Sequence, residues 1–218
     1  KERVERLMQE NGIKAKHKRR FKATTDSNHN LPVAPNLLDR NFTPSAPNQV
    51  WTSDITYLWT NEGWLYLAIV LDLFNREVVG WSLKPRMTAD IVTDALTMAW
   101  FRRKPAAGLI HHSDRGSQYV SIRYTERLAE AGIEPSVGSK GDSYDNALAE
   151  TINGLYKAEL IHRRAPWKTV ESLELATLEW VTWFNHQRLL EPIGHIPPTE
   201  AEDRYYLQLT AQAEHACT

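Results

Sequence analysis

Residues 49–84, QVWTSDITYLWTNEGWLYLAIVLDLFNREVVGWSLK, determine the fold that we expect for this chain. β-Branched and aromatic residues dominate 49–59, which predicts a strand. A nearly continuous apolar run at 63–74 predicts a second strand that is buried on both faces, and 76–84 predicts a third. Because the connections between these segments are short, the three strands are predicted to pair antiparallel as a meander.

Helical and strand patterns alternate after the meander, where apolar spacing and turn residues mark the element ends. The predicted elements are helices at 89–104, 117–131, around Glu150, at 169–189 and at 200–211, and short strands at 108–114 and 133–137. Thr88 and Thr199 are the predicted N-caps of the first and last of these helices. This order implies an α/β protein with a mixed five-stranded sheet and helices on both of its faces.

The composition is that of an ordinary globular protein with one well-buried core: 218 residues, 42% hydrophobic and 24% charged. The single cysteine, Cys217, excludes a disulfide within the chain and predicts a reducing compartment. No apolar run reaches the roughly 20 residues that a membrane-spanning helix needs. We therefore expect a cytoplasmic protein that has no membrane partner.

Charge is distributed unevenly, although the net charge is only −1. Residues 1–22 contain nine Lys or Arg and three Glu, whereas residues 23–149 carry a net charge of −3 and residues 150–218 carry −4. A basic arm ahead of an acidic body suits contact with phosphates, and it equally describes a solvated tail. The cations that this arm offers for phosphate contact include Lys14, Lys16, Lys18, Arg19 and Arg20.

These patterns divide the chain into four parts. Residues 1–22 form the basic arm, and residues 23–48 form a polar linker that contains four prolines and shows little periodicity. Residues 49–200 form the folded core, and residues 201–218 form a C-terminal helix and tail.

Three carboxylates stand out by their positions in the predicted elements. Asp54 lies inside the first strand, Asp114 lies where the strand GLIHH leaves the sheet, and Glu150 lies in a helix among small residues. Each has an ordinary alternative: an edge-strand aspartate bonded to backbone, a turn former, and a solvated helical glutamate. Between them lie 59 and 35 residues, and ligand sites in mixed sheets lie at strand ends.

Taken together, the three acids suit phosphoryl transfer assisted by two metal ions. Hard cations such as Mg²⁺ take oxygen ligands, and three carboxylates suffice if one of them bridges both ions. The ions would lie about 3.5–4 Å apart, one activating the attacking water or 3′-hydroxyl and the other stabilising the leaving 3′-oxygen. No Ser-His-Asp arrangement, glycine-rich phosphate loop or zinc-ligand spacing competes with this interpretation.

Four segments resemble the integrase-type catalytic core of bacterial insertion-sequence transposases, within the group that makes its transposase by frameshifting between two reading frames. They are PNQVWTSDITYL (47–58), GWLYLAIVLDLFNREVVGWSL (63–83), HSDRGSQY (112–119) and GDSYDNALAETINGLYKAEL (141–160). The resemblance runs from Asn36 to Ala201 and implies a ribonuclease-H-like fold. It also implies that Asp54, Asp114 and Glu150 form a catalytic triad that binds two Mg²⁺ (or Mn²⁺) ions.

The resemblance further implies the reaction. Such enzymes hydrolyse a phosphodiester at a transposon end, and the freed 3′-hydroxyl attacks a second phosphodiester, typically beside the other end of the same element. The expected partners are transposon-end and target DNA at the bacterial nucleoid, with a homo-oligomer, a dimer, assembled on DNA.

Residues 1–22 resemble the close of a helix-turn-helix region. In the family's tail motif Leu190 stands here in place of a histidine, which makes a required role for that histidine doubtful.

Two other functions stay open at this point: a nuclease of the same fold that lacks strand transfer, and a non-catalytic module that bridges DNA. Strand transfer on a labelled transposon end separates the nuclease from the transposase. Loss of metal-dependent cleavage on removal of Asp54, with DNA binding retained, separates an enzyme from a bridging module.

Several residues near the three acids are candidates for DNA contact. Lys157 lies seven residues after Glu150, about two helical turns, so that both share a face and the lysine can reach phosphate or solvent. Asn146 and Asn153 can reach DNA or orient Glu150. The remaining candidates are Tyr144, which can stack on a base or pack at the helix start, and Arg115 and Lys140, which lie in loops.

The histidines and tryptophans are predicted to serve packing. Of His111 and His112, one should face the core by strand alternation, and packing is favoured over metal ligation for both. The eight tryptophans are expected to fill the core rather than to stack on bases, and they include Trp51, Trp64, Trp81, Trp180 and Trp183.

Overall fold

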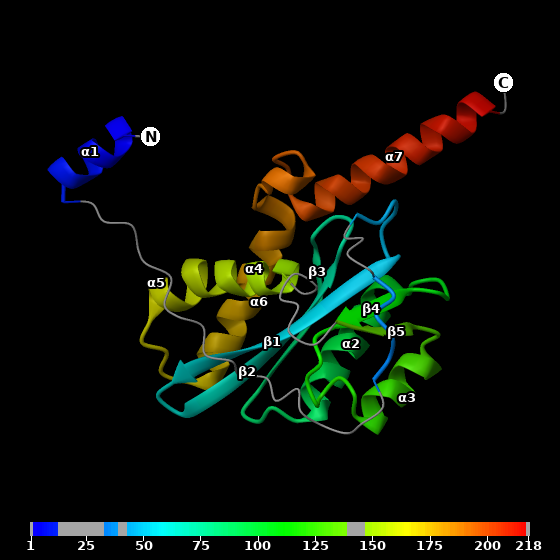
Figure 1. Cartoon of the computed structure of the whole chain (residues 1–218), viewed down its shortest axis with the longest axis horizontal. Coiled ribbons are helices and arrows are strands. Elements are labelled where there is room, and N and C mark those ends of the chain that lie inside the picture. The colour runs from blue at the N-terminus through cyan, green and yellow to red at the C-terminus, as the bar shows by residue number, and fades with distance from the viewer. Residues whose placement is uncertain (1, 13–32, 39–42, 139–146, 217–218) are drawn as a thin grey trace.

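The computed structural model describes residues 2–12, 33–38, 43–138 and 147–216. Its centre is a five-stranded sheet with the strand order β3-β2-β1-β4-β5 (Figure 1). Strands β1 (Val50–Thr60), β2 (Gly63–Asp72) and β3 (Val78–Lys84) form the antiparallel meander, while β4 (Ile110–Ser113) and β5 (Glu134–Val137) run parallel to β1. The predicted mixed five-stranded sheet is therefore confirmed.

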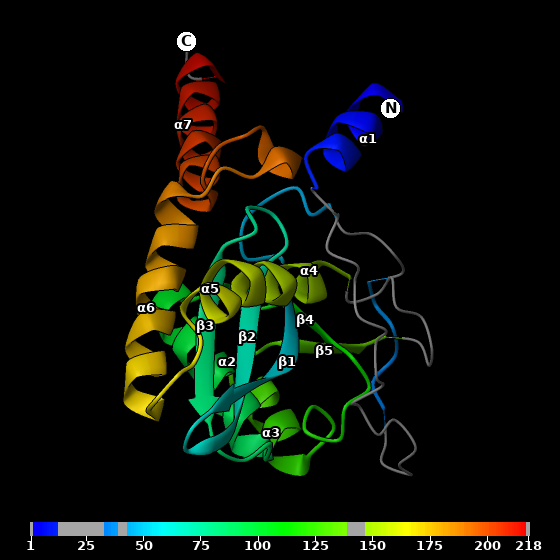
Figure 2. The same cartoon turned by 90° about the vertical axis from the view of Figure 1, so that its left-hand side faces the viewer.

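Helices cover both faces of this sheet, as predicted (Figure 2). One face carries α2 (Ala89–Arg103) and α3 (Ile122–Glu130). The other carries α4 (Ala147–Tyr156), its π-helical continuation η1 (Lys157–Ile161), α5 (His162–Arg164) and α6 (Val170–Gln187). The remaining elements are α1 (Glu2–Glu10), the 3-10 turn η2 (Glu191–Ile193) and α7 (Pro198–Ala216).

Strand β2 shows why the apolar run predicts burial on both faces. Its residues Leu67, Ile69 and Leu71 belong to the core shared with α4 and α6, whereas Ala68 and Val70 belong to the core shared with α2 and α3. Successive side chains of a strand point to opposite faces, so that a central strand contributes to two cores at once.

Helix α2 packs against β3 at a position that only glycine can occupy. A Cβ atom added at Gly80 would lie 2.2 Å from the carbonyl oxygen of Ala95 and 2.9 Å from the Cβ of Ala99. The absence of a side chain lets the two backbones approach directly, which fixes α2 and the loop before it relative to the sheet.

Two predicted helix starts are wrong, those of α3 and α7, whereas the predicted N-cap position of Thr88 is confirmed. Helix α3 begins at Ile122 rather than at 117, because Ser121 is its N-cap and accepts a hydrogen bond from the backbone N–H of Tyr124. Thr88 occupies the N-cap position of α2 but makes no side-chain capping bond. Thr199 lies inside α7, whose first residue is Pro198, and its hydroxyl donates to the carbonyl oxygen of Asn185.

Helix α7 extends away from the body of the molecule, from the end of α6 (Figure 1). The turn of the β1–β2 hairpin is tied to the segment at the start of α6, because the backbone N–H of Asn61 donates to the carbonyl oxygen of Trp167 at 2.9 Å and Glu62 accepts from the backbone N–H of Val170. Across the described part of the chain, no helix combines the length and the apolar character that crossing a membrane requires.

Candidate active site

The end of strand β4 places two of the three predicted carboxylates next to each other. Strand β4 pairs with β1 only from Val50 to Ser53, and its last residue, Ser113, lies opposite Ser53. The residues that follow this pair on the two parallel strands are Asp54 and Asp114. Both carboxylates therefore lie where β4 leaves the sheet, and they line one cavity.

Asp54 lies in an environment that opposes its charge. The pKa of Asp54 is raised to about 7, chiefly by burial and then by the neighbouring charge of Asp114, with a smaller contribution from Glu150. The side-chain amide of Asn153 on α4 donates to Oδ2 of Asp54 at 2.8 Å and lowers this pKa in part. The carboxylate is thus surrounded by negative charge and has one amide donor from the helix above it.

Asp114 is held in a tight turn after β4. Its Oδ1 accepts a hydrogen bond from the backbone N–H of Gly116 at 3.0 Å. A Cβ atom at Gly116 would lie 3.0 Å from this oxygen, so that a side chain there would displace the carboxylate of Asp114 slightly. The buried hydroxyl of Tyr119 lies near the same acids. Burial is the main cause that raises the pKa of this tyrosine well above its ordinary value, and the charges of Asp114 and Asp54 add to it.

Glu150 occupies the facing helix α4 and is exposed. It acts on the pKa of Asp54 electrostatically, as the smallest of the contributions named above. Among the described residues, no three Asp, Glu, His or Cys side chains lie close enough to hold a metal ion together. The structure therefore brings Asp54 and Asp114 together and places Glu150 over them, but without the shared coordination geometry that we expected.

The chemistry of these donors nevertheless fits a divalent cation. Carboxylate oxygens are the ligands that hard cations prefer. A cation between Asp54 and Asp114 would also remove the repulsion that raises the pKa of Asp54. A bound cation would therefore neutralise the excess negative charge of these half-buried carboxylates.

Lys157 is the first residue of η1 and lies beside β1. Its Nζ lies over the ring of Tyr57 at 4.7 Å from the centroid. Burial lowers the pKa of Lys157, and the charge of Asp54 opposes this effect. Arg115 follows Asp114 directly and is partly buried.

The position of Asn153 differs from the predicted DNA contact. Its side chain is 4% exposed, and its amide group bonds to Asp54 rather than to Glu150 or to solvent. Eight further candidates lie outside the described residues: Lys14, Lys16, Lys18, Arg19, Arg20, Lys140, Tyr144 and Asn146.

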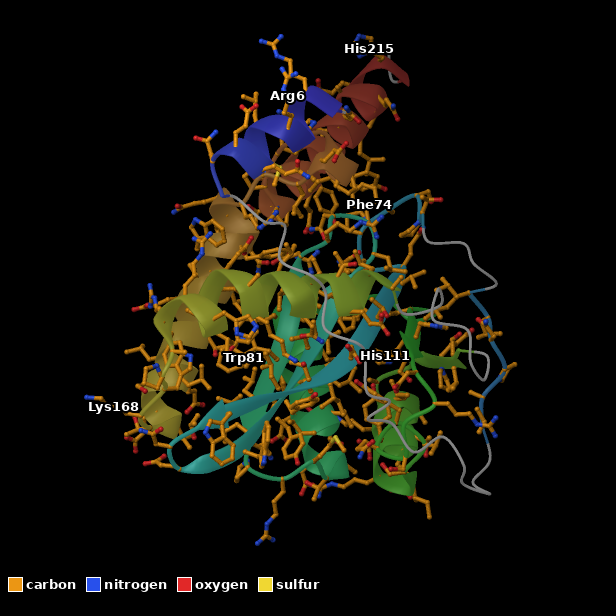
Figure 3. All side chains as sticks on the ribbon, turned by 60° about the vertical axis from the view of Figure 1, so that its left-hand side comes forward. Arg6, Phe74, Trp81, His111, Lys168 and His215 are labelled. Atoms are coloured by element: carbon orange, nitrogen blue, oxygen red, sulfur yellow. The ribbon has the colours of Figure 1, made fainter. Side chains whose placement is uncertain are left out.

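Both neighbouring histidines are buried, whereas only one of them was predicted to face the core. His111 lies inside the molecule in Figure 3, where its Nε2 is 2.7 Å from the hydroxyl oxygen of Ser53. Nδ1 of His112 is 2.9 Å from the hydroxyl oxygen of Ser136 on β5. These bonds join β4 to the strands on either side, which is a packing role.

The prediction that tryptophans fill the core is confirmed for Trp51, Trp81 and Trp180 and is wrong for Trp64 and Trp183. Trp64 is 51% exposed and Trp183 is 39% exposed. Trp64 belongs to a group of aromatic residues on one face of the β1–β2 hairpin, where Tyr57 lies opposite Tyr66 and Trp59 lies opposite Trp64. Alternating aromatics at facing positions of two strands were the signal in the sequence that this interpretation missed.

A cavity of about 340 Å³ connects this aromatic group to the carboxylates. Asp54 and Asp114 line one end, and Tyr57, Trp64 and Tyr66 line the other. Met87, from the loop before α2, and Gln118, from the turn after β4, complete its wall. The acids and the aromatic rings thus belong to one continuous depression at the edge of the sheet.

Comparisons with known proteins give a consistent family. The family model described as "Integrase core domain" matches residues 44–143, and a second model of the same description matches residues 131–198. A putative transposase for insertion sequence element IS986/IS6110 of Mycobacterium tuberculosis is 48% identical over 210 residues, covering 94% of this chain and 76% of the relative. The transposase for insertion sequence element IS629 of Shigella sonnei is 49% identical over 188 residues, covering 86% of this chain and 63% of the relative.

Solved structures show the same fold at low sequence identity. The catalytic core domain of HTLV-2 integrase in complex with magnesium matches with a TM-score of 0.56 and 19% identity, covering 72% of this chain and 98% of that chain. The catalytic core domain of BIV integrase matches with a TM-score of 0.56 and 21% identity, covering 75% of this chain and 99% of that chain.

Proposed function

Because this chain belongs to the integrase core domain family of insertion-sequence transposases, we propose that it cleaves transposon ends and joins the freed 3′-hydroxyl to a second DNA strand. One observation carries the assignment of the site: Asp54 and Asp114 lie side by side at the end of β4, with α4 and Glu150 opposite. This is the arrangement of acids that metal-assisted phosphoryl transfer uses.

The residues proposed to hold the metal are Asp54, Asp114 and Glu150. When bound, two Mg²⁺ or Mn²⁺ ions would supply an activated water or 3′-hydroxyl and stabilisation of the leaving 3′-oxygen. The amide of Asn153 holds the carboxylate of Asp54 toward α4. For Glu150 to join the other two acids, α4 or its side chain must move toward β1, and binding of DNA and metal is the proposed cause.

DNA is the proposed partner at several surfaces. Lys157 lies near Asp54 with its ammonium group at the rim of the cavity, where it can contact a phosphate. Arg115, together with Lys140, Tyr144, Asn146 and the basic arm, is proposed to extend this contact. Two copies assembled on two transposon ends would carry out the paired reactions, at the nucleoid in the bacterial cytoplasm.

Replacement of Asp54 tests the catalytic assignment. Asp54→Asn keeps the size of the side chain but removes the charge that binds metal, so cleavage of a labelled transposon end in Mg²⁺ should fall at least about 100-fold. Asp203→Asn removes an exposed acid on α7 and should leave cleavage unchanged. Binding of the same DNA should change less than about threefold in either variant.

The products distinguish the alternatives. A transposase gives joined strands in which the labelled 3′ end is linked to a second DNA, whereas a nuclease gives cleaved ends alone. If Asp54→Asn cleaved as fast as the unaltered protein, the catalytic assignment would be wrong, and a bridging module would be the better description.

A further inference from the structure

We propose that the cavity beside the carboxylates is a binding site for one unstacked nucleobase, with Trp64 and Tyr57 as its stacking surface. The proposal rests on the proposed function in one respect, because that function places a DNA strand at Asp54 and Asp114. It adds a site for a base, in contact with rings that the cleavage reaction itself does not require.

The first argument is the exposure of the aromatic rings. Tyr57 is 41% exposed, Trp59 is 56% exposed and Trp64 is 51% exposed, although large aromatic side chains usually contribute to burial. The ring of Trp64 meets those of Tyr57 and Trp59 edge to face, with centroids 5.5 Å and 4.9 Å apart. Edge-to-face packing stabilises the hairpin. Lys157 covers one face of the Tyr57 ring, and about half of the Trp64 side chain stays exposed for a further flat partner.

The second argument is the shape and size of the depression. A cavity of about 340 Å³ is at the small end of the range for ligand sites, so that it admits one base and excludes a duplex. Gln118 fixes one wall, because its side-chain amide donates to the carbonyl oxygen of Met87 at 3.3 Å. A base inserted here would lie between Met87 and the aromatic rings, with Ser117 and Gln118 near its polar edge.

The third argument is the distribution of charge. The two carboxylates at the inner end repel phosphates, whereas the ammonium group of Lys157 lies over the outer ring of Tyr57. A nucleotide satisfies both conditions when its uncharged base enters the cavity and its phosphate stays at Lys157. Stacking of bases on aromatic side chains depends little on sequence, so this site would hold a frayed strand end rather than read it.

A binding experiment in EDTA tests the proposal without any cleavage. Fluorescence anisotropy would measure affinity for three probes. They are a blunt DNA duplex, the same duplex with a short single-stranded extension, and the extended duplex in which abasic sites replace the nucleotides of the extension. The unaltered protein should bind the extended duplex more tightly than the other two, which should bind alike. Failure of the catalytic assignment would not affect this result, because neither metal nor turnover is involved.

Variants of Trp64 identify the stacking surface. Trp64→Ala should weaken binding of the extended duplex about 5- to 100-fold and leave the other two probes unchanged. Trp64→Phe keeps an aromatic ring and should retain most of the affinity. Trp183→Ala removes a tryptophan of similar exposure on α6, which lines a different cavity, and should change none of the three.

Three results would overturn the proposal. The first is an equal loss of affinity for all three probes in Trp64→Ala, which would indicate a general effect on DNA binding. The second is no loss for any probe. The third combines two observations: the unaltered protein self-associates in sedimentation and Trp64→Ala abolishes this, while the variant binds each probe as tightly as the unaltered protein does. That result would identify the aromatic face as a contact between copies. Quenching of tryptophan fluorescence by the extended probe, and not by the abasic one, gives a check on the unaltered protein if a variant fails to fold.

Discussion

Asp54 combines two properties that a strand residue rarely has together. It lies in the middle of β1, where apolar and β-branched residues are favoured, and it lies beside a second carboxylate. The buried charge is stabilised in this structure by a side-chain bond from Asn153 and by a backbone bond at Ile55. An arrangement that remains unfavourable after these bonds has its reason in the ligand that the site binds.

Asn153 should therefore act on catalysis through Asp54 and not through DNA. Asn153→Ala removes the side-chain amide that donates to Asp54 while α4 keeps a good helix former, so cleavage in Mg²⁺ should fall about 10-fold or more. Thr151→Ala is the matched control, because Thr151 is exposed on the same helix and its hydroxyl bonds to the helix's own backbone at Ala147.

The measurement that separates the two roles compares cleavage rate with DNA affinity. A positioning role predicts a lower rate at unchanged affinity, together with a higher Mg²⁺ concentration at half-maximal rate. A DNA contact predicts the opposite: weaker binding of DNA, with an unchanged requirement for metal.

At the scale of elements, the sequence predicted the sheet more fully than the site. The meander was predictable because short connections leave only antiparallel pairing, and the apolar run of β2 leaves only a central position. The positions of Asp54 and Asp114 follow from the parallel pairing of β1 with β4. The alternating aromatics assign Trp64 to one face of the hairpin, but alternation does not show whether a helix covers that face.

A buried ionic cluster joins α7 to the body, and it too depends on contacts that are distant in sequence. Arg103, at the end of α2, contacts Glu202 on α7 at 2.6 Å and Glu77 before β3 at 3.1 Å. The side chains of Glu77 and Arg103 are only 5% and 13% exposed. Burial raises the pKa of Glu77, and the charge of Arg103 is the largest of the effects that oppose this rise.

Replacement of Arg103 should release α7. Arg103→Met keeps the length of the side chain but removes the cation that Glu77 and Glu202 share, while Glu77 keeps Arg102 at 3.5 Å. The loss should lower the free energy of unfolding by about 3–5 kcal/mol. Urea denaturation measures this loss, and hydrogen exchange should increase first in the turn of α7 that contains Glu202.

The exposed pair of Arg204 and Glu200 on α7 provides the control. Because exposed pairs contribute about 1 kcal/mol or less, Arg204→Met should be nearly neutral. A similar effect of both substitutions would show that burial of the cluster around Arg103 is not what holds α7.

At the scale of the whole molecule, the chain must bring an acidic body to an acidic polymer. Residues 23–149 and 150–218 carry net charges of −3 and −4, whereas residues 1–22 carry nine Lys or Arg against three Glu. The site itself adds to the repulsion, because Asp54, Asp114 and Glu150 act on one another. Attraction to DNA in the absence of metal therefore has to come from cations outside the carboxylate site, and the basic arm holds the greatest density of them.

We accordingly expect the arm to set the salt dependence of DNA binding. Replacing Lys14, Lys16, Lys18, Arg19 and Arg20 together by Gln keeps the chain length and removes only charge. Each of these cations that contacts a phosphate contributes about 0.9 to the slope of log affinity against log salt, so the slope should become shallower by up to about 4 to 5. Affinity should fall by a similar factor for transposon-end and unrelated DNA, since phosphate contacts carry no sequence information. An unchanged slope would show that the arm is solvated in the complex, and a loss confined to transposon ends would show that it reads sequence.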